Sequence, residues 1–369
     1  MSKRRLCYVI GTRPEVIRSA AIFRAFDSGY PQVVVDLLNS GQHFDPSMMS
    51  QLSEEVGLRT PTRTLPTPLG RQSKRFAAMV MNMVDVLEEG RYDAVVVYGD
   101  TDSSLAGALA GVKTRTPVVH IEAGCRSGDM RMQEEINRRL IDHVSALDLA
   151  VSENCLANLR AEAVPGHLVM TGDPQYDVFW EHRPAVTGPT GPIPRGFVTM
   201  HRAENVDDTS FLWKVFAALE SFGERTSTVF TWASHPRTSA FLCTLPLSPW
   251  VQILQPLPYR ETLQHLAQAS VCLTDSGGLQ KEAFWLRTPC VTMRSSTEWV
   301  ETVAVGANVL CPAPEDLDEA LASAISARRR VRWTVDPYGG AGSSQRAAAV
   351  IVEWLDGDGG AGWRRSISQ

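Results

Sequence analysis

Short apolar runs of strand length recur along the chain, and helical patterns separate them. The runs that predict strands lie at 6–10, 33–38, 94–98, 117–121 and 147–151 in the first half, and at 197–200, 229–232, 251–254, 271–273 and 290–293 in the second. The helical patterns lie at 71–89, 279–286, 316–327 and 347–355. Near-continuous apolar strands that alternate with helices are typical of parallel sheets covered on both faces. The pattern predicts an α/β protein.

Proline and glycine concentrate between the two sets of predicted strands. Residues 182–196 contain four prolines and three glycines, a composition typical of a linker. We therefore expect two Rossmann-like domains, the second of which binds the ligand's phosphates. The expected boundaries are 1–180 for the first domain, 181–196 for the linker, 197–343 for the second domain, 344–356 for a helix that crosses back onto the first domain, and 357–369 for a tail.

Composition narrows the class of protein. The 369 residues suffice for two domains of ordinary size, and 44% hydrophobic with 21% charged residues is the balance of a globular protein. A net charge of −5 argues against a nucleic-acid partner, and no apolar stretch approaches the roughly 20 residues of a membrane span. The seven cysteines are scattered and form no C-x-x-C pair, so neither a disulfide framework nor a zinc site is indicated. We expect a cytoplasmic protein without a metal or a cofactor.

Polar side chains follow many of the predicted strands. They are Arg13, Asp100 and Glu122 in the first half, and His201, His235 and Arg294 in the second. Ligands of open parallel sheets bind at the carboxyl ends of the strands. The sequence therefore predicts a ligand site at these sheet edges.

Residues 274–282, TDSGGLQKE, join a predicted strand to a predicted helix. Two glycines let the backbone approach a ligand closely, and the first N–H groups of the helix favour a phosphate or diphosphate. Ser276, Gly277 and Gly278 are the candidate donors, and Glu282, one turn inside the helix, is placed to accept hydrogen bonds from a ribose. The alternative interpretation is an ordinary turn that needs glycine for packing.

Seven short strings occur in a fixed order with sensible spacing. They are GTRPE at 11–15, GQH at 41–43, YGDT at 98–101, HIEAG at 120–124, EExNR at 134–138, HRxEN at 201–205 and DSGG at 275–278. Together they make the chain resemble the UDP-N-acetylglucosamine 2-epimerase family along nearly its whole length. The resemblance implies a GT-B type fold, with two Rossmann-like domains that face a cleft, and a homodimer. It also implies interconversion of UDP-GlcNAc and UDP-ManNAc, or the same inversion in a modified UDP-HexNAc.

The chemistry that the resemblance implies is elimination of UDP to a glycal, followed by re-addition with the other configuration at C2. Departure of UDP needs preorganised donors, and inversion needs proton transfer on both faces of the sugar. Asp100, Glu122 and Glu134 correspond to the family's acidic residues, and His201 to its catalytic histidine. The residues expected to bind UDP or the sugar are Arg13, Arg18, His43, Arg138, His235, Ser276, Gly277, Gly278, Glu282 and Arg294.

Each catalytic candidate also has an ordinary structural explanation. Asp100 would serve as a helix cap, Glu134 as a first-turn charge, and His201 as a core histidine bound to a carbonyl. The ordered strings favour catalysis. Three departures from the family pattern leave the sugar open, a diamino-uronic acid included: Arg18 stands where lysine is usual, Gln133 where proline is usual, and residues 44–45 where a second glutamine linked to allosteric control is usual.

Three other functions compete with a non-hydrolysing epimerase. A hydrolysing epimerase would release free ManNAc and UDP, and the sequence does not separate these two outcomes. A GT-B glycosyltransferase is disfavoured by carboxylates at the strand ends of the first domain, where an acceptor surface would lie. A non-catalytic UDP-sugar-binding protein is disfavoured because all the acidic positions are intact.

Overall fold

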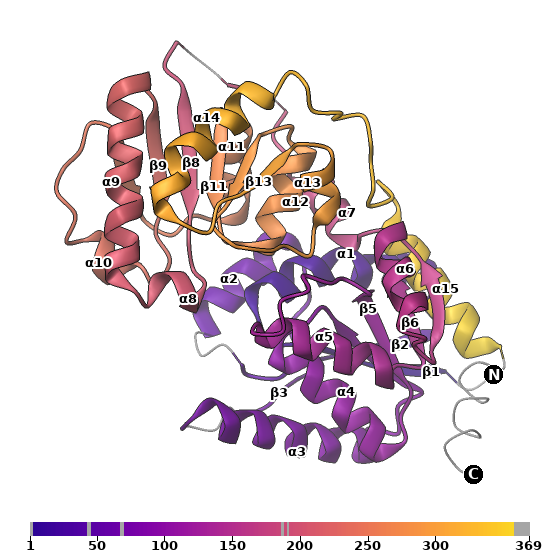
Figure 1. The fold of residues 1–369 in the computed structure, drawn as a ribbon. Coiled ribbons are helices and arrows are strands. Elements are labelled where there is room, and N and C mark those ends of the chain that lie inside the picture. The colour runs from indigo at the N-terminus through magenta and orange to yellow at the C-terminus, as the bar shows by residue number, and fades with distance from the viewer. Residues whose placement is uncertain (1–2, 43–45, 67–69, 186–187, 190–191, 358–369) are drawn as a thin grey trace. The chain divides into compact units, whose positions relative to one another are not determined.

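The computed structural model describes residues 3–42, 46–66, 70–185, 188–189 and 192–357. The chain divides into two compact α/β units (Figure 1). The first unit comprises residues 1–181 and 337–369, and the second comprises residues 182–336. Within the described part, no helix is both long and apolar enough to cross a bilayer.

The unit boundaries differ from the expected ones for packing reasons. The second unit ends at Asp336 rather than at residue 343, because Tyr338 is buried in the first unit and its carbonyl accepts a hydrogen bond from Asp173 N at 2.8 Å. Most of the expected linker, 181–196, belongs to the second unit. There the Gly188 N–H donates to the carbonyl of Ala267 at 2.9 Å, which ties this segment to the unit's body.

The sheet of the first unit is parallel and has the strand order β3-β2-β1-β4-β5-β6-β7 among the described residues. Its strands are β1 (Arg4–Ile10), β2 (Val33–Asn39), β3 (Arg63–Thr64), β4 (Ala94–Tyr98), β5 (Val118–Ala123), β6 (Leu147–Ala150) and β7 (His167–Met170). Its helices are α1 (Arg13–Gly29), α2 (Pro46–Val56), α3 (Gln72–Gly90), α4 (Asp102–Thr114), α5 (Gln133–Val144), α6 (Glu153–Ala161), α7 (Pro174–His182, which ends at the boundary) and α15 (Ser343–Asp356). Helix α15 packs beside α1.

The sheet of the second unit is also parallel, with the order β10-β9-β8-β11-β12-β13 among the described residues. Its strands are β8 (Arg195–Thr199), β9 (Val229–Ala233), β10 (Val251–Leu254), β11 (Val271–Thr274), β12 (Cys290–Thr292) and β13 (Asn308–Leu310). Its helices are α8 (Ala203–Val206), α9 (Thr209–Thr226), α10 (Ser239–Leu242), α11 (Tyr259–Gln268), α12 (Gly277–Trp285), α13 (Val300–Ala304) and α14 (Leu317–Ala327), with a 3₁₀ turn, η1, at Pro314–Asp316.

All ten predicted strands are present, with ends that differ by at most two residues. The strands that the sequence analysis missed, β3, β7 and β13, lie at the edges of the two sheets. Each is short and partly exposed, so its apolar signal is weak. The central strands β4 and β5 are buried at every position, which explains why apolar residues, valine above all, predominate in them.

One buried carboxyl in the first sheet lacks a partner. Asp148 on β6 is 0% exposed, and neither of its oxygens has a hydrogen-bond partner among the described residues. Burial, reinforced by the nearby charge of Asp142, raises the pKa of the Asp148 carboxyl well above its usual value. The folded protein therefore keeps this proton at a pH where the unfolded chain releases it.

We expect this retained proton to make stability fall as pH rises. An unfolded aspartate loses its proton near pH 4, so above that pH the unfolded state is favoured progressively until Asp148 ionises in the folded state too. Asp148→Asn removes the carboxyl and with it this contribution to the pH dependence of stability. Urea unfolding at pH 5 and pH 8 should show a smaller loss of stability on raising the pH for the variant than for the wild type. Equal losses would contradict the assignment.

Candidate active site

The strand order in each unit reverses at one point, and the predicted site residues follow the strands that flank it. In the first sheet the reversal lies between β1 and β4, and in the second between β8 and β11. Ligands of doubly wound sheets bind outside the strand ends at such a point. Arg13 follows β1, Asp100 follows β4, His201 follows β8 and Ser276 follows β11. Each unit therefore presents a site of its own at this position.

Glu122 lies at the carboxyl end of β5 in an unusual backbone conformation. Its φ is +72°, a left-handed value that is uncommon outside glycine, and the register with β6 shifts between Ile121 and Ala123. The side chain is 5% exposed and forms an ion pair with Arg18. Burial alone would lower the pKa of the Arg18 guanidinium, but the acidic groups around it, Glu122 foremost, raise that pKa above its usual value. A charged Arg18 therefore pairs with the Glu122 side chain at the carboxyl end of β5.

Asp100 approaches this pair through a glycine turn. Gly99 has φ +74°, and a Cβ there would lie 3.1 Å from Nη1 of Arg18 and 3.7 Å from Oε2 of Glu122. The Asp100 side chain pairs with Arg138 on α5. The next helix, α4, is capped by Thr101, whose Oγ1 accepts from Ser104 N at 3.1 Å. Asp100 is therefore not needed as a cap, and its carboxylate is available for chemistry.

The two glutamates at the start of α5 have different surroundings. Glu135 is 0% exposed and accepts hydrogen bonds from Ser127 N at 2.8 Å and Arg139 Nε at 3.0 Å. Glu134 is half-buried and has no hydrogen bond or ion pair with any described residue. It stands one turn before Arg138 on the same side of the helix. Glu135 therefore stabilises the loop before α5 through Ser127, while Glu134 is the glutamate that can contact a ligand.

The start of α1 presents a cation rather than free backbone donors. The buried Glu15 carboxylate accepts from Gly11 N at 2.7 Å and Thr12 N at 2.8 Å. Arg13, at the first helical position, is partly buried, and it forms no ion pair with a residue in the described ranges. Burial lowers the pKa of Arg13, which the charge of Glu55 opposes. The Arg13 guanidinium is therefore the group at the start of α1 that can bind an anion. His43, another expected binding residue, lies outside the described residues.

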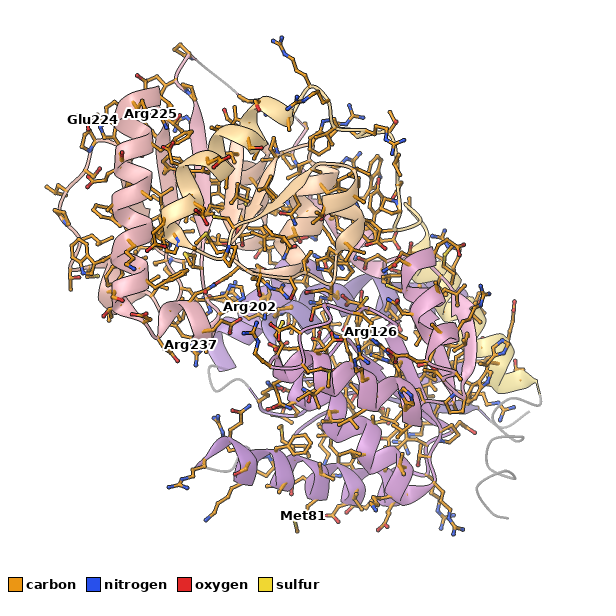
Figure 2. All side chains as sticks on the ribbon, viewed as in Figure 1. Met81, Arg126, Arg202, Glu224, Arg225 and Arg237 are labelled. Atoms are coloured by element: carbon orange, nitrogen blue, oxygen red, sulfur yellow. The ribbon has the colours of Figure 1, made fainter. Side chains whose placement is uncertain are left out.

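In the second unit, the turns after β8 and β11 are joined by Asp275. This carboxylate is 0% exposed and accepts from His201 N and Arg202 N, each at 3.0 Å, and from Asn205 Nδ2 at 3.1 Å. Arg202 is labelled in Figure 2. The His201 side chain is 38% exposed, with Nδ1 3.4 Å from Asp275 and its ring centroid 5.5 Å from that of His235. His201 is therefore not a core histidine but a ring oriented by a carboxylate.

We expect Asp275→Asn to weaken the second unit. An amide cannot accept equally through both of its ends, so at least one buried N–H loses its charged acceptor, at a cost of about 1.5–3 kcal/mol. Guanidinium unfolding measures this. Asp208→Asn is the matched control, because Asp208 caps α9 at an exposed position and asparagine caps about as well. Equal stability of the two variants would contradict a joining role for Asp275.

The start of α12 offers unused backbone donors. Ser276 N donates to Thr274 Oγ1 at 3.0 Å, and Ser276 Oγ accepts from Leu279 N at 3.5 Å. The N–H groups of Gly277 and Gly278 donate to no described residue. The expectation of three backbone donors is therefore corrected to two, because the Ser276 amide is already engaged in the turn. The helix end remains suited to a phosphate.

Acidic side chains surround this helix end. Glu282 is buried and accepts from the Tyr259 hydroxyl at 2.8 Å. Arg294, which follows β12, donates to Glu298 Oε2 at 2.8 Å. A Cβ on Gly277 would lie 2.5 Å from Glu298 Oε1, so the glycine is required for this close approach. Arg294 is thus held beside the helix end by a carboxylate.

Sequence reasoning missed two residues that build the site. Glu15 and Asp275 both stood in the quoted strings, yet neither was assigned a role. The signal for Glu15 was its position three residues after Thr12, the spacing of a capping box. The signal for Asp275 was an acidic residue between a buried strand and a glycine pair.

Comparison with known proteins identifies the family. The family model described as UDP-N-acetylglucosamine 2-epimerase matches residues 28–352. The chain belongs to this family. A Pseudomonas aeruginosa relative, UDP-2,3-diacetamido-2,3-dideoxy-D-glucuronate 2-epimerase, is 37% identical over 95% of this chain and 99% of its own. The Methanocaldococcus jannaschii UDP-N-acetylglucosamine 2-epimerase is 32% identical over 94% and 99% of the two chains. The prediction of a UDP-sugar 2-epimerase, an isomerase, is confirmed at the level of the family.

Solved structures support the fold of the family. The crystal structure of the M. jannaschii enzyme in complex with UDP-GlcNAc and UDP matches with a TM-score of 0.84 at 30% identity, over 95% of this chain and 99% of that one. A spinosyn rhamnosyltransferase matches with a TM-score of 0.55 at 16% identity, a likeness of fold alone. The predicted class, α/β with two Rossmann-like domains of the GT-B type, is confirmed.

Proposed function

We propose that this protein is a non-hydrolysing 2-epimerase of a UDP-HexNAc. The observation that carries the proposal is the pair of carboxylates, Glu122 and Asp100, at adjacent strand ends of the first unit, where Glu122 pairs with the partly buried Arg18 and Asp100 with the buried Arg138. The second unit contributes a helix end with two unused donors and an oriented histidine. Carboxylates suit proton transfer at carbon, and the helix end suits a diphosphate.

The reaction proceeds by elimination and re-addition. As the C1–O bond to UDP breaks, the C2 proton passes to a carboxylate, and UDP leaves with the bonding electrons. The glycal then takes a proton at C2 on the opposite face while UDP re-forms the bond at C1. We assign the two proton transfers to Glu122 and Asp100, with Glu134 as the third acidic group near Arg138. Arg13, Gly277, Gly278 and His201 stabilise the charge that develops on UDP.

The remaining proposed binding residues act around these groups. Arg18 and Arg138 orient the two carboxylates, while Glu282 holds the ribose and Arg294 lies beside the diphosphate. His235 supports His201, and His43 is proposed from the GQH string alone. The enzyme acts as a cytoplasmic homodimer, for which the support is the resemblance to the family, and light scattering of the purified protein tests the dimer.

Two sugars deserve a direct test, because the relatives are named for different substrates. UDP-GlcNAc and UDP-2,3-diacetamido-2,3-dideoxyglucuronic acid are each incubated with the protein and analysed by chromatography with mass spectrometry. A non-hydrolysing epimerase gives a second UDP-sugar of unchanged mass from one of them. Free sugar with stoichiometric UDP would identify the hydrolysing reaction instead. Neither product from either substrate would contradict the proposal.

We expect Gly278→Val and Arg13→Ala to weaken binding of UDP. The first blocks backbone approach to the diphosphate and the second removes a cation. Loss of one charge-assisted hydrogen bond costs on the order of 2 kcal/mol, or about 30-fold in Kd. Titration calorimetry with UDP measures the change. Gly29→Val is the control, since a Cβ at Gly29 meets nothing within 4 Å. Unchanged affinity in both variants would place the diphosphate elsewhere.

A further inference from the structure

A fully buried histidine contacts the turn that carries Asp100 and lies on the strand that carries Glu122. His120 is on β5, two residues before Glu122, and is 0% exposed. Its Nε2 is 2.9 Å from the carbonyl oxygen of Gly99, the residue before Asp100. Its Nδ1 is 2.7 Å from Oδ1 of Asp142 on α5. The ring thus connects the Asp100 turn to the helix that carries Arg138.

Each ring nitrogen of His120 has one polar partner. A carbonyl oxygen only accepts, so Nε2 carries a hydrogen and donates to Gly99. Nδ1 faces Oδ1 of Asp142, whose Oδ2 accepts from Gly124 N at 3.2 Å and from Arg126 Nη2 at 2.7 Å. Buried polar groups therefore hold the ring at both ends.

The groups around the ring are themselves paired or buried. Arg126, labelled in Figure 2, pairs with both Asp142 and Glu162, and Glu162 also pairs with Arg139 at 3.1 Å. Asp148, opposite His120 on β6, is fully buried, and burial raises the pKa of its carboxyl well above the usual value. His120 thus lies in a fully buried polar cluster.

We propose that His120 is a positioning residue, whose ring fixes the Gly99–Asp100 turn while Asp142 holds the ring. Gly99 needs fixing because its left-handed backbone brings it to the Arg18–Glu122 pair. The same Asp142 binds Gly124 N, in the turn after Glu122. One buried pair therefore sets the distance between the turns of both carboxylates. This inference rests on the proposed function, in which those carboxylates transfer the C2 proton.

Two isosteric substitutions separate the two ends of the ring. The amide nitrogen of asparagine approximates Nδ1, and that of glutamine approximates Nε2. His120→Asn keeps a donor toward Asp142 but loses Gly99, and His120→Gln keeps a donor toward Gly99. We expect the asparagine variant to lose about 10²-fold in kcat for deuterium exchange at C2, the cost of a misplaced catalytic group. The glutamine variant should lose about tenfold or less, and KM and UDP affinity should stay near wild type in both.

His143→Asn and His143→Gln are the matched controls, because His143 is an exposed residue of the same helix as Asp142. A purely structural role for His120 predicts equal kcat losses that follow the melting temperatures. Equal losses, or a less active glutamine variant, would overturn the positioning role, as would wild-type exchange in both.

A second readout does not depend on turnover or on the variants folding. Long-range ¹H–¹⁵N spectra of the wild-type protein should show a hydrogen on Nε2 of His120, the atom that donates to the Gly99 carbonyl. An Nε2 without a hydrogen would overturn that contact and the positioning role with it. Absence of deuterium exchange at C2 by the wild type would contradict the proposed function but would not change this protonation result. The two failures are therefore distinguishable.

Discussion

Glu122→Gln should nearly abolish exchange of the C2 proton while leaving the fold and UDP binding in place. Glutamine has almost the same shape, and its amide oxygen still accepts from Arg18, but it cannot take a proton. General-base catalysis contributes on the order of 10²–10⁴-fold, so kcat should fall by that factor. The loss should appear in kcat rather than in KM, because binding of the ground state is retained.

The measurement is exchange of deuterium from D2O into the UDP-sugar, followed by NMR. Glu89→Gln is the control, since Glu89 is an exposed carboxylate that pairs only with Arg63 among the described residues. A Glu122→Gln enzyme with near-normal exchange would remove this residue from the proton transfer. Its ion pair with Arg18 would then have a structural role alone.

Asp100→Asn should cause a second loss of similar size, with an added cost in stability. The asparagine cannot carry the proton, so kcat should again fall on the order of 10²–10⁴-fold. Arg138 is 2% exposed and would keep a hydrogen bond to the asparagine amide oxygen but lose the negative charge that faces it. The loss of stability should therefore be well below the roughly 3–5 kcal/mol of a broken buried pair, and smaller still because the Asp100 side chain is 26% exposed.

Kinetics and unfolding together test this expectation. Asp102→Asn is the control, because Asp102 lies in the first turn of α4 and makes no ion pair with a described residue. A variant of Asp100 that loses stability but keeps exchange would leave it a structural residue. A variant that loses exchange without stability would show that Arg138 is held by Glu135 instead.

The central strands and their polar ends were predictable from the sequence, and the pairing of side chains was not. A buried parallel strand is mostly apolar, so short apolar runs marked β4 and β5, and Asp100 and Glu122 lie at the carboxyl ends of these strands. Arg18 and Glu122 are 104 residues apart, and their contact depends on how α1 and the end of β5 are placed in the folded unit. No local pattern encodes that.

Helix phase and turn geometry limited the prediction in two other places. Which of Glu134 and Glu135 points inward depends on where α5 begins, and the missing proline before the pair gave no guide. Ser276 was expected to donate to a phosphate, but its amide donates to Thr274 Oγ1 instead.

The unit boundary at Asp336 was not predictable either. It depends on the burial of Tyr338, a contact between segments more than 160 residues apart in sequence.

The most direct test of the account is incubation of the wild-type protein with UDP-GlcNAc in D2O, repeated with the diacetamido-glucuronate substrate. We predict a second UDP-sugar that carries deuterium at C2, with deuterium also appearing at C2 of the recovered substrate and no free sugar. Epimerised product that retains the original C2 hydrogen, or no product from either substrate, would contradict proton transfer at C2 by these carboxylates.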